Sequence, residues 1–490
     1  MVKKLLNRIQ KNRAIQDLLL NSFWSIIGTF ISKVLLFLIW IFVAKILKAD
    51  LYGEFSIIRS TTMLFADFVG SSIGIAGTNY IAKYYGSDNS KVERLLGLFN
   101  LFSFILGLVL FVSALSCSDI IATNMLNRTD LTIYLQVSSI VILVSSINNN
   151  QYGILRGFNQ YKRISKINLL QIIFSFPVYY LGTYFFSLKG AVGAYVFYNI
   201  IVCLLTRFEL KKLFCTLQVK PSYKNCIQES QVILSFIFPY IISSFIVAFL
   251  SWYNETRLVG LPQGYTQMGY YSIINVVVLI IINMSFMVCA PFVSIMSKYR
   301  DSNSIYLLEK LNIFLPLLVA LFISVPLMLF PEIIGWIYGP SYTIENIRLI
   351  SNYMFFFAFL GVYRQAIARF VAVKEKSWLY FGDSVSFSLF SVCLFFYFYH
   401  YGVLGFVWGQ TIACMTIVLL FLPLYLKSDI LSRHLIKDSY LGLLFIQIIL
   451  VFIFSFYDFS FVARSLLCIA ILGGNLYLFY KKYLLSIKKI

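Results

Sequence analysis

Four charged side chains lie deep inside apolar runs that are long enough to cross a membrane: Lys33, Arg59, Asp67 and Arg364. A charge at this depth is costly, and it marks a paired charge, an ion path or a water-filled cavity. Arg59 and Asp67 are eight residues apart in one run, which on an α-helix places them about 80° apart around the axis and about 12 Å apart along it. Because three of the four charges are cations, the pattern predicts a water-accessible, cation-lined path through a membrane.

The residues alone leave two roles open for this pair. Arg59 either lines the path or forms an ion pair with Asp67, and Asp67 either is that partner or couples movement to a proton or sodium ion. Glu255 and Arg257, near the end of another run, are either an outer gate or ordinary loop charges. The two histidines lie in separate loops and the eight cysteines show no metal-ligand spacing, so neither a metal centre nor a catalytic group is expected,.

The composition fits only a polytopic membrane protein. Of the 490 residues, 60% are hydrophobic and 12% are charged, whereas about a quarter of the residues in a soluble protein are charged. The net charge of +20 arises from short basic clusters between the apolar runs, which is typical of loops held at an anionic cytoplasmic leaflet. The charge therefore does not indicate a nucleic-acid partner.

Fourteen apolar runs approach or exceed the roughly 20 residues that cross the hydrocarbon core. They predict an all-α integral membrane protein with about fourteen transmembrane helices. The runs are Phe23–Ile46, Phe55–Ala76, Leu95–Leu115, Ile133–Ile154, Ile167–Phe186, Ala191–Leu210, Val232–Tyr253, Tyr270–Phe292, Leu311–Phe330, Leu349–Val371, Trp378–Tyr399, Val403–Leu426, Leu441–Phe456 and Phe461–Tyr480.

The basic residues orient these helices. If the N-terminus is cytoplasmic and the helices alternate, 30 of the 40 Lys and Arg side chains fall on the cytoplasmic side and seven on the outer side. This bias predicts an even number of spans and both termini on the cytoplasmic side of the inner membrane. The basic segment 1–20 has apolar residues at near-helical spacing, so it is expected to lie along the inner interface as an amphipathic helix.

An internal repeat divides the chain into two six-helix lobes. GEFSII at 53–58 and GYYSII at 269–274 open helices 2 and 8, an offset of 216, and two further pairs of short segments recur at offsets of 213 and 212,. Six helices separate the copies, so the repeat is parallel, related by a pseudo-twofold axis along the membrane normal, and predicts a site between the lobes. The expected organisation is an N-tail at 1–20, an N-lobe at 21–210, a basic linker at 211–230, a C-lobe at 231–427, and helices 13 and 14 with a basic C-tail at 428–490.

Four short segments carry a family resemblance. They are LYGEFSIIRS between helices 1 and 2, YGILRGFNQYKRISKIN after helix 4, GAVGAYVFYN at helix 6 and GYYSIINVV at helix 8. In them the chain resembles the Wzx-type polysaccharide flippases of the multidrug/oligosaccharidyl-lipid/polysaccharide (MOP) exporter superfamily, over residues 15–426. The resemblance implies alternating-access transport of undecaprenyl-pyrophosphate-linked O-antigen or capsule units from the cytoplasmic to the outer leaflet.

The resemblance also implies roles for the deep cations. A pyrophosphate-linked glycan needs positive charge in the cavity, and Arg can bind phosphate oxygens bidentately. Lys33, Arg59 and Arg364 are therefore expected to line that cavity. No cofactor is expected beyond a coupling proton or sodium ion. The expected partners are the lipid-linked glycan, membrane lipids, a polysaccharide polymerase and a chain-length regulator.

Three alternatives stay open from the sequence. A multidrug or organic-cation antiporter of the same fold would favour an acid-rich cavity, which the deep charges do not provide. A lipid II-type flippase would also have fourteen helices, the last pair forming a groove for the lipid tail. A polymerase or glycosyltransferase is disfavoured, because no connection exceeds about 25 residues and the chain has neither a DxD motif nor a GxxxxGK phosphate loop,. The chain is therefore expected to be a transporter and not an enzyme.

Overall fold

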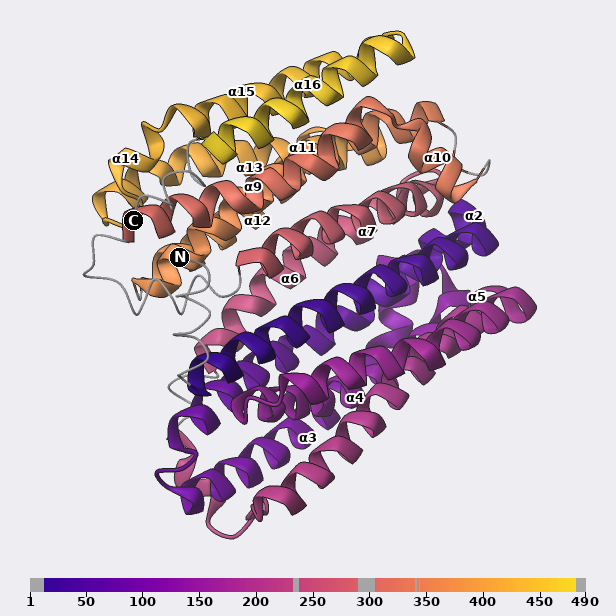
Figure 1. The fold of residues 1–490 in the computed structure, drawn as a ribbon. Helices are drawn as coiled ribbons and strands as arrows, with labels where there is room; N and C mark the ends of the chain where they lie inside the picture. Colours follow the sequence, from indigo (N-terminus) through magenta and orange to yellow (C-terminus); the bar gives the residue numbers. More distant parts are fainter. Residues whose placement is uncertain are drawn as a thin grey trace. The chain divides into compact units, whose positions relative to one another are not determined.

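The computed structural model describes residues 13–231, 238–289, 305–339, 342, 344–374 and 376–481. Its chain divides into two compact units, Met1–Met268 and Gly269–Ile490 (Figure 1). The lobe boundaries expected at 210 and 231 stay a prediction, as does the amphipathic helix at 1–20, of which residues 1–12 lie outside the described part.

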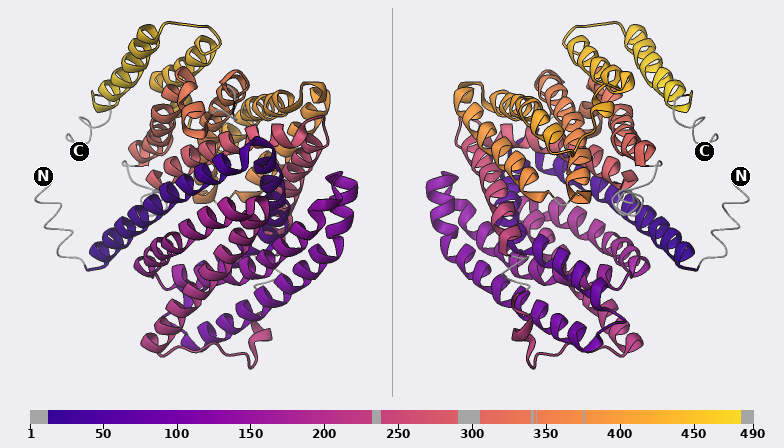
Figure 2. Two further views of the ribbon diagram at one scale, coloured as in Figure 1. Left: turned by 90° about the vertical axis from the view of Figure 1, so that its right-hand side faces the viewer. Right: turned by 90° about the vertical axis from the view of Figure 1, so that its left-hand side faces the viewer.

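The first unit is built on two long helices that each fold back at a kink (Figure 2). α2 (Arg13–Tyr84) turns at Lys48, where the backbone has φ 60° and ψ −179°. α5 (Tyr161–Leu217) turns at Ser187, with φ 50° and ψ −129°. Each kink separates two of the predicted apolar runs. The notable Asp50–Gly53 segment between the first two runs predicts a sharp turn, but the structure turns earlier, at Lys48, and Asp50–Gly53 is helical.

Three shorter helices complete the first unit: α3 (Asn89–Ile120), α4 (Thr132–Gly157) and α6 (Phe238–Val259). α4 packs against α2, α3 and α5, and α6 packs against α2. An apolar cluster that includes Val92 and Leu210 joins α3 to α5. The unit therefore presents a continuous helical scaffold on which the charged residues of α2 are positioned.

Glycines allow α2 and α4 to approach each other closely. A methyl group at Gly153 would lie 2.5 Å from the carbonyl oxygen of Gly74, so only a residue without a side chain fits there. The GxxxG spacing of Gly70 and Gly74 predicts close helix packing. Gly74 does lie at this crossing, whereas the surroundings of Gly70 fall outside the described part of the chain.

Gly153→Ala is expected to destabilise the protein. The added methyl group must push α2 and α4 apart, which costs about 1–3 kcal/mol. The measurement is the melting temperature of the purified protein in detergent. Gly193→Ala is the matched control, because a methyl group at Gly193 meets nothing within 4 Å. Equal melting temperatures for the two variants would contradict the close approach.

The second unit is organised around α11 (Ile344–Val373), which contacts α9, α12, α13 and α15. α16 (Phe461–Phe479) packs on α9 but buries few residues, so it lies at the margin of the unit. The remaining helices are α7 (Gly264–Cys289), which begins in the first unit, α9 (Ile305–Leu329), α10 (Glu332–Tyr338), α12 (Ser377–Tyr397), α13 (Gly402–Lys427), α14 (Arg433–Ile436) and α15 (Ser439–Phe454).

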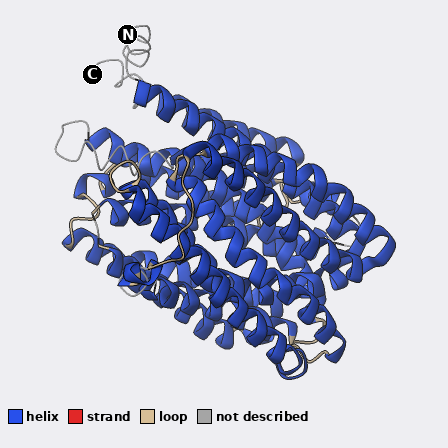
Figure 3. Ribbon diagram, turned by 90° about the horizontal axis from the view of Figure 1, so that it is seen from below, coloured by secondary structure: helices blue, strands red, loops and turns tan. Residues whose placement is uncertain are grey.

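The described residues form helices and contain no strand (Figure 3). Among them, nine helices are long and apolar enough to cross a membrane. Twelve helices have sixteen residues or more, and the kinks in α2 and α5 bring the helical segments of the described part to fourteen. The prediction of an all-α, multi-pass membrane protein is therefore confirmed. The helix of the seventh run continues to Val259 instead of ending at Tyr253.

Candidate functional site

Arg59 lies in the second half of α2, where the fold-back at Lys48 brings it against an aromatic cluster. Its guanidinium carbon is 4.5 Å from the centre of the Trp40 ring, a cation–π contact,. The Trp40 ring in turn packs against Phe55 and Tyr179, with ring centres 5.8 and 5.4 Å apart. Arg59 is partly buried and forms no ion pair with any side chain that the structure describes. The Trp40 ring thus positions the positive charge of Arg59, and no carboxylate in the described part of the chain forms an ion pair with it.

Two polar contacts join α6 to the same part of α2. The hydroxyl of Ser60 donates a hydrogen bond to the Glu255 carboxylate. The indole Nε1 of Trp252 donates to Thr61 Oγ1 at 2.9 Å. Trp252 and Glu255 are buried, and Glu255 is close enough to Arg59 for their charges to attract each other. Arg59 and Glu255 therefore belong to one polar region between α2 and α6.

The structure gives the two residues of the predicted outer gate different surroundings. Glu255 faces α2, whereas Arg257 is exposed and its Nε donates a hydrogen bond to the Tyr253 hydroxyl at 3.2 Å. Both lie within α6 and not in a loop, because the helix continues past them. The gate role stays a prediction, and Ser60 is the residue of α2 that such a gate would release.

Two predicted site residues of the first unit are not seen in the polar region between α2 and α6. One lies elsewhere on α2, and the side chain of the other is not described. Lys33 is on the first half of α2 and is exposed, with no hydrogen bond or ion pair to a described residue. The side chain of Asp67 lies outside the described part of the structure. The predicted ion pair between Arg59 and Asp67 therefore stays a prediction.

Arg364 lies in the second unit, where α11, α12 and α13 meet. Its Nη2 is 2.8 Å from Asp383 Oδ1, and the Tyr425 hydroxyl donates to Oδ2 of the same carboxylate at 2.9 Å. The Phe387 ring lies 4.4 Å from the guanidinium carbon. This cation consequently has a buried counter-charge, which weakens its attraction for an anion. Its role in substrate binding stays a prediction.

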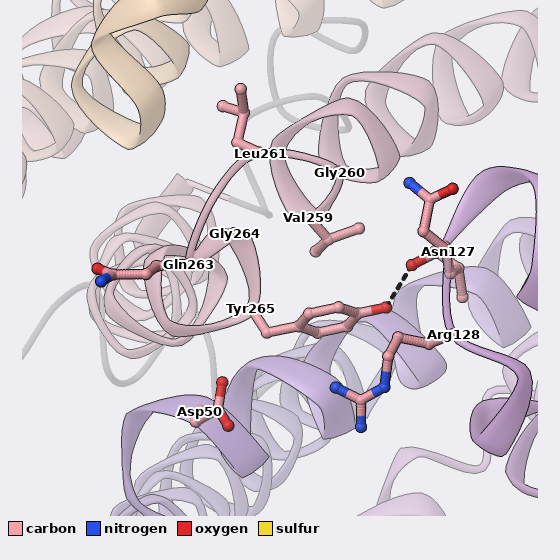
Figure 4. A pocket seen from close by; sticks show the side chains of 10 residues that line it. Asp50, Asn127, Arg128, Val259, Gly260, Leu261, Gln263, Gly264 and Tyr265 are labelled. Carbon is pink, nitrogen blue, oxygen red and sulfur yellow. Dashed lines mark hydrogen bonds between the residues drawn. The ribbon is translucent and has the colours of Figure 1, made fainter.

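A pocket of about 270 Å³ opens beside the loop between α6 and α7 (Figure 4). The ring of Tyr265 forms one wall, and its hydroxyl donates a hydrogen bond to the carbonyl oxygen of Leu126 at 2.7 Å. The pocket is lined by Asp50, Leu126, Asn127, Arg128, Val259, Gly260, Leu261, Gln263, Gly264 and Tyr265.

The charge balance of this pocket argues against a phosphate ligand. Arg128 makes two hydrogen bonds of 2.7 Å to Asp130 and one of 3.0 Å to Glu54. The hydrogen bonds to Asp130, assisted by the charge of Glu54, raise the pKa of Arg128 above its ordinary value. Asp50 adds a further carboxylate to the lining. Because carboxylates outnumber the single cation, Arg128 is not free to bind an anion.

Among the predicted cations whose side chains are described, Arg59 is therefore the best-placed candidate to bind an anion. Arg364 is paired and Lys33 is exposed, whereas Arg59 is partly buried and free of a described ion pair. Neither Trp40 nor Trp252 stands out in the sequence as a candidate site residue. Trp40 could have been found from the predicted order of the helices. Helices 1 and 2 are antiparallel, so a residue before the turn lies opposite a residue at a similar distance after the turn, as Trp40 and Arg59 do.

The fold is that of the MOP superfamily transporters. MurJ, a lipid II flippase solved in an inward closed conformation, has a TM-score of 0.68 and 18% identity, over 93% of this chain and 98% of that chain. An inward-facing multidrug resistance MATE family transporter of the MOP superfamily has a TM-score of 0.66 and 17% identity, over 83% and 96%. A MOP superfamily transporter from Pyrococcus furiosus has a TM-score of 0.64 and 17% identity, over 83% and 94%.

The chain belongs to the family described as "Polysaccharide biosynthesis protein". The family model matches residues 18–296, which is more than half of the 490-residue chain. A search of curated proteins finds no match. This family and the fold in common with MOP superfamily transporters agree with the expected resemblance.

Proposed function

We propose that this chain is a flippase for undecaprenyl-pyrophosphate-linked oligosaccharides, such as O-antigen or capsule repeat units. Membership of a polysaccharide biosynthesis family supports a saccharide cargo, and the fold in common with a lipid II flippase supports a lipid-linked one. The observation that carries the proposal is Arg59, a partly buried cation that rests on Trp40 without a described ion pair. Such a guanidinium can take the oxygens of a diphosphate bidentately.

The proposed protein spans the inner membrane with both termini in the cytoplasm. It moves the glycan by alternating access, and a proton or sodium gradient drives it. Lys33 and Arg364 add positive charge along the path, and Glu255 closes it by holding α6 to α2 through Ser60. A polysaccharide polymerase and a chain-length regulator receive the delivered unit.

A multidrug or organic-cation antiporter is the second candidate, supported by the fold in common with a multidrug resistance MATE transporter. A positively charged cargo would be repelled by Arg59 and would find Asp383 already neutralised by Arg364. The electrostatics therefore favour an anionic cargo. A lipid II-type substrate carries the same diphosphate, and only the attached saccharide distinguishes it.

Reconstitution into liposomes tests the proposal. The purified protein and a labelled undecaprenyl-diphosphate oligosaccharide are placed in vesicles, and a glycosidase added outside reports which glycan heads have crossed. We expect crossing that depends on an imposed ion gradient and needs no ATP. Protein-free vesicles and the Arg59→Ala protein are the controls. Crossing that required ATP with no other protein present, or export of organic-cation dyes without glycan crossing, would contradict the proposal.

A further inference from the structure

Four buried hydroxyl groups on α2 and α5 have no hydrogen-bond partner among the residues that the structure describes. Their residues are 0–3% exposed. Burying a hydroxyl without a partner is unfavourable, and such groups in a native structure call for a specific reason. The four residues are Tyr52, Ser56, Tyr179 and Thr183.

The hydroxyls belong to two helices that pack against each other. Tyr52 and Ser56 are one turn apart on α2, and Arg59 follows three residues later, so these three side chains share one helix face. Tyr179 and Thr183 are likewise one turn apart on α5,. The Tyr52 and Tyr179 hydroxyls both lie within the electrostatic reach of the Arg59 guanidinium. Donors from both helices are therefore gathered beside one cation.

We propose that these four hydroxyls complete, together with Arg59, a binding site for a diphosphate group. Each hydroxyl can donate to a phosphate oxygen, and the guanidinium supplies the positive charge. A bare cation would also accept hydroxyl ligands, but the charge of Arg59 would repel it. Glu255, whose charge attracts Arg59, has its hydrogen bond from Ser60 and not from this cluster. The inference rests on the proposed function and names the residues that hold the head group of its cargo.

We expect the ring of Trp40 to control access to the cluster. It contacts both the Arg59 guanidinium, at 4.5 Å, and the Tyr179 ring, at 5.4 Å. Arg59 and Trp40 are partly buried, whereas the hydroxyl-bearing residues are fully buried. A diphosphate therefore meets Arg59 first and reaches the hydroxyls as the guanidinium leaves the Trp40 ring. Binding should change the fluorescence of Trp40, a signal that disappears in Trp40→Phe.

The double variant Tyr52→Phe/Tyr179→Phe separates a binding role from a packing role. It removes two hydroxyls that have no described partner while it keeps both rings, so the melting temperature should stay the same or rise. Affinity for inorganic diphosphate and for farnesyl diphosphate should fall by about tenfold or more, because two charge-assisted hydrogen bonds are lost. Both quantities are measured on the full-length protein in detergent, by thermal unfolding and by tryptophan fluorescence titration.

Tyr152→Phe is the matched control. Its hydroxyl is also in the first unit, but it has a partner, Asn168 Oδ1 at 3.0 Å. Removing it should lower the melting temperature and leave the affinity for both probes unchanged. Tighter binding of farnesyl diphosphate than of inorganic diphosphate would identify a lipid-linked ligand, and equal binding would identify the diphosphate alone. Equal competition by phosphatidylglycerol would overturn the diphosphate assignment.

Other outcomes separate this inference from the proposed function. Unchanged affinity in the double variant, or no binding of either probe by the wild type, would overturn the inference. The flippase proposal would survive that result if cells that lack the protein still lose their surface glycan. Conversely, normal surface glycan in such cells, combined with lost diphosphate binding in the double variant, would overturn the flippase proposal and leave the diphosphate site standing.

Discussion

The Arg59→Ala protein is expected to accumulate in the membrane at the wild-type level and to deliver no glycan to the outer surface. Arg59 has no ion pair with a described side chain, and the nearby buried Glu255 carboxylate keeps its hydrogen bond from Ser60 when Arg59 is removed. A hydrogen bond to a charged group contributes about 1.5–3 kcal/mol, and losing one lowers affinity by roughly 10- to 150-fold. Immunoblotting measures the amount of protein, and lectin labelling of intact cells measures the delivered glycan.

Two further variants decide what Arg59 does. Arg59→Lys should keep part of the activity, because the charge and the contact with Trp40 survive while bidentate binding is lost. If Arg59 serves only to neutralise Asp67, each single neutral variant should reduce protein levels. The double variant Arg59→Ala/Asp67→Ala should then recover both abundance and function. An abundant but inactive double variant would keep Arg59 in the substrate site.

The second large effect is expected at the buried ion pair of the second unit. Arg364→Ala leaves the Asp383 carboxylate buried, with the Tyr425 hydroxyl as its remaining hydrogen-bond donor. Removing one partner of a buried pair typically costs about 3–5 kcal/mol. The variant should therefore melt at a much lower temperature and be present at reduced levels, in contrast to Arg59→Ala. Thermal unfolding in detergent and membrane abundance measure this difference.

An apolar replacement of the whole pair separates structure from transport. Arg364→Met/Asp383→Leu removes both charges at similar volume, and such replacements are often neutral or stabilising. A stable double variant that still transports would mean that the pair is structural. A stable double variant that does not transport would retain Arg364 as a substrate cation. Asp383→Asn is the mild control, since its amide oxygen can still accept a hydrogen bond from Arg364 or Tyr425.

Most helix positions could be predicted, because a span of hydrocarbon needs a minimum length of apolar residues. The predicted run Val403–Leu426 corresponds to α13 at Gly402–Lys427, and Phe461–Tyr480 corresponds to α16 at Phe461–Phe479. The end of α6 could not be predicted in the same way. Its last turns are polar and read as a loop, but they are buried, and Glu255 is hydrogen-bonded to α2. Burial against another helix can therefore continue a helix beyond the point at which the hydropathy of the sequence predicts its end.

For the candidate site, the sequence predicts only how deep in the membrane each charged residue lies. The sequence places Arg59 and Arg364 deep in apolar runs, because the number of residues from a helix end sets the depth of each charge. Their neighbours depend on how each helix is rotated. α2 and α11 carry apolar residues around most of their circumference, so no amphipathic stripe indicates which side faces which neighbour,. The partners Trp40 and Asp383 therefore emerge only from the packed structure.

By itself the sequence determined that this protein is helical, crosses a membrane many times and carries cations at membrane depth. Hydrocarbon tolerates only long apolar helices, and a rare charge within one is conspicuous. Only the packing of the helices shows which described groups those cations contact. Arg364 meets Asp383 because α11 and α12 pack side by side, and Arg59 meets an aromatic ring because α2 folds back at Lys48. Contacts between residues far apart in the chain depend on helix rotation and spacing, which a one-dimensional pattern of apolar residues does not encode.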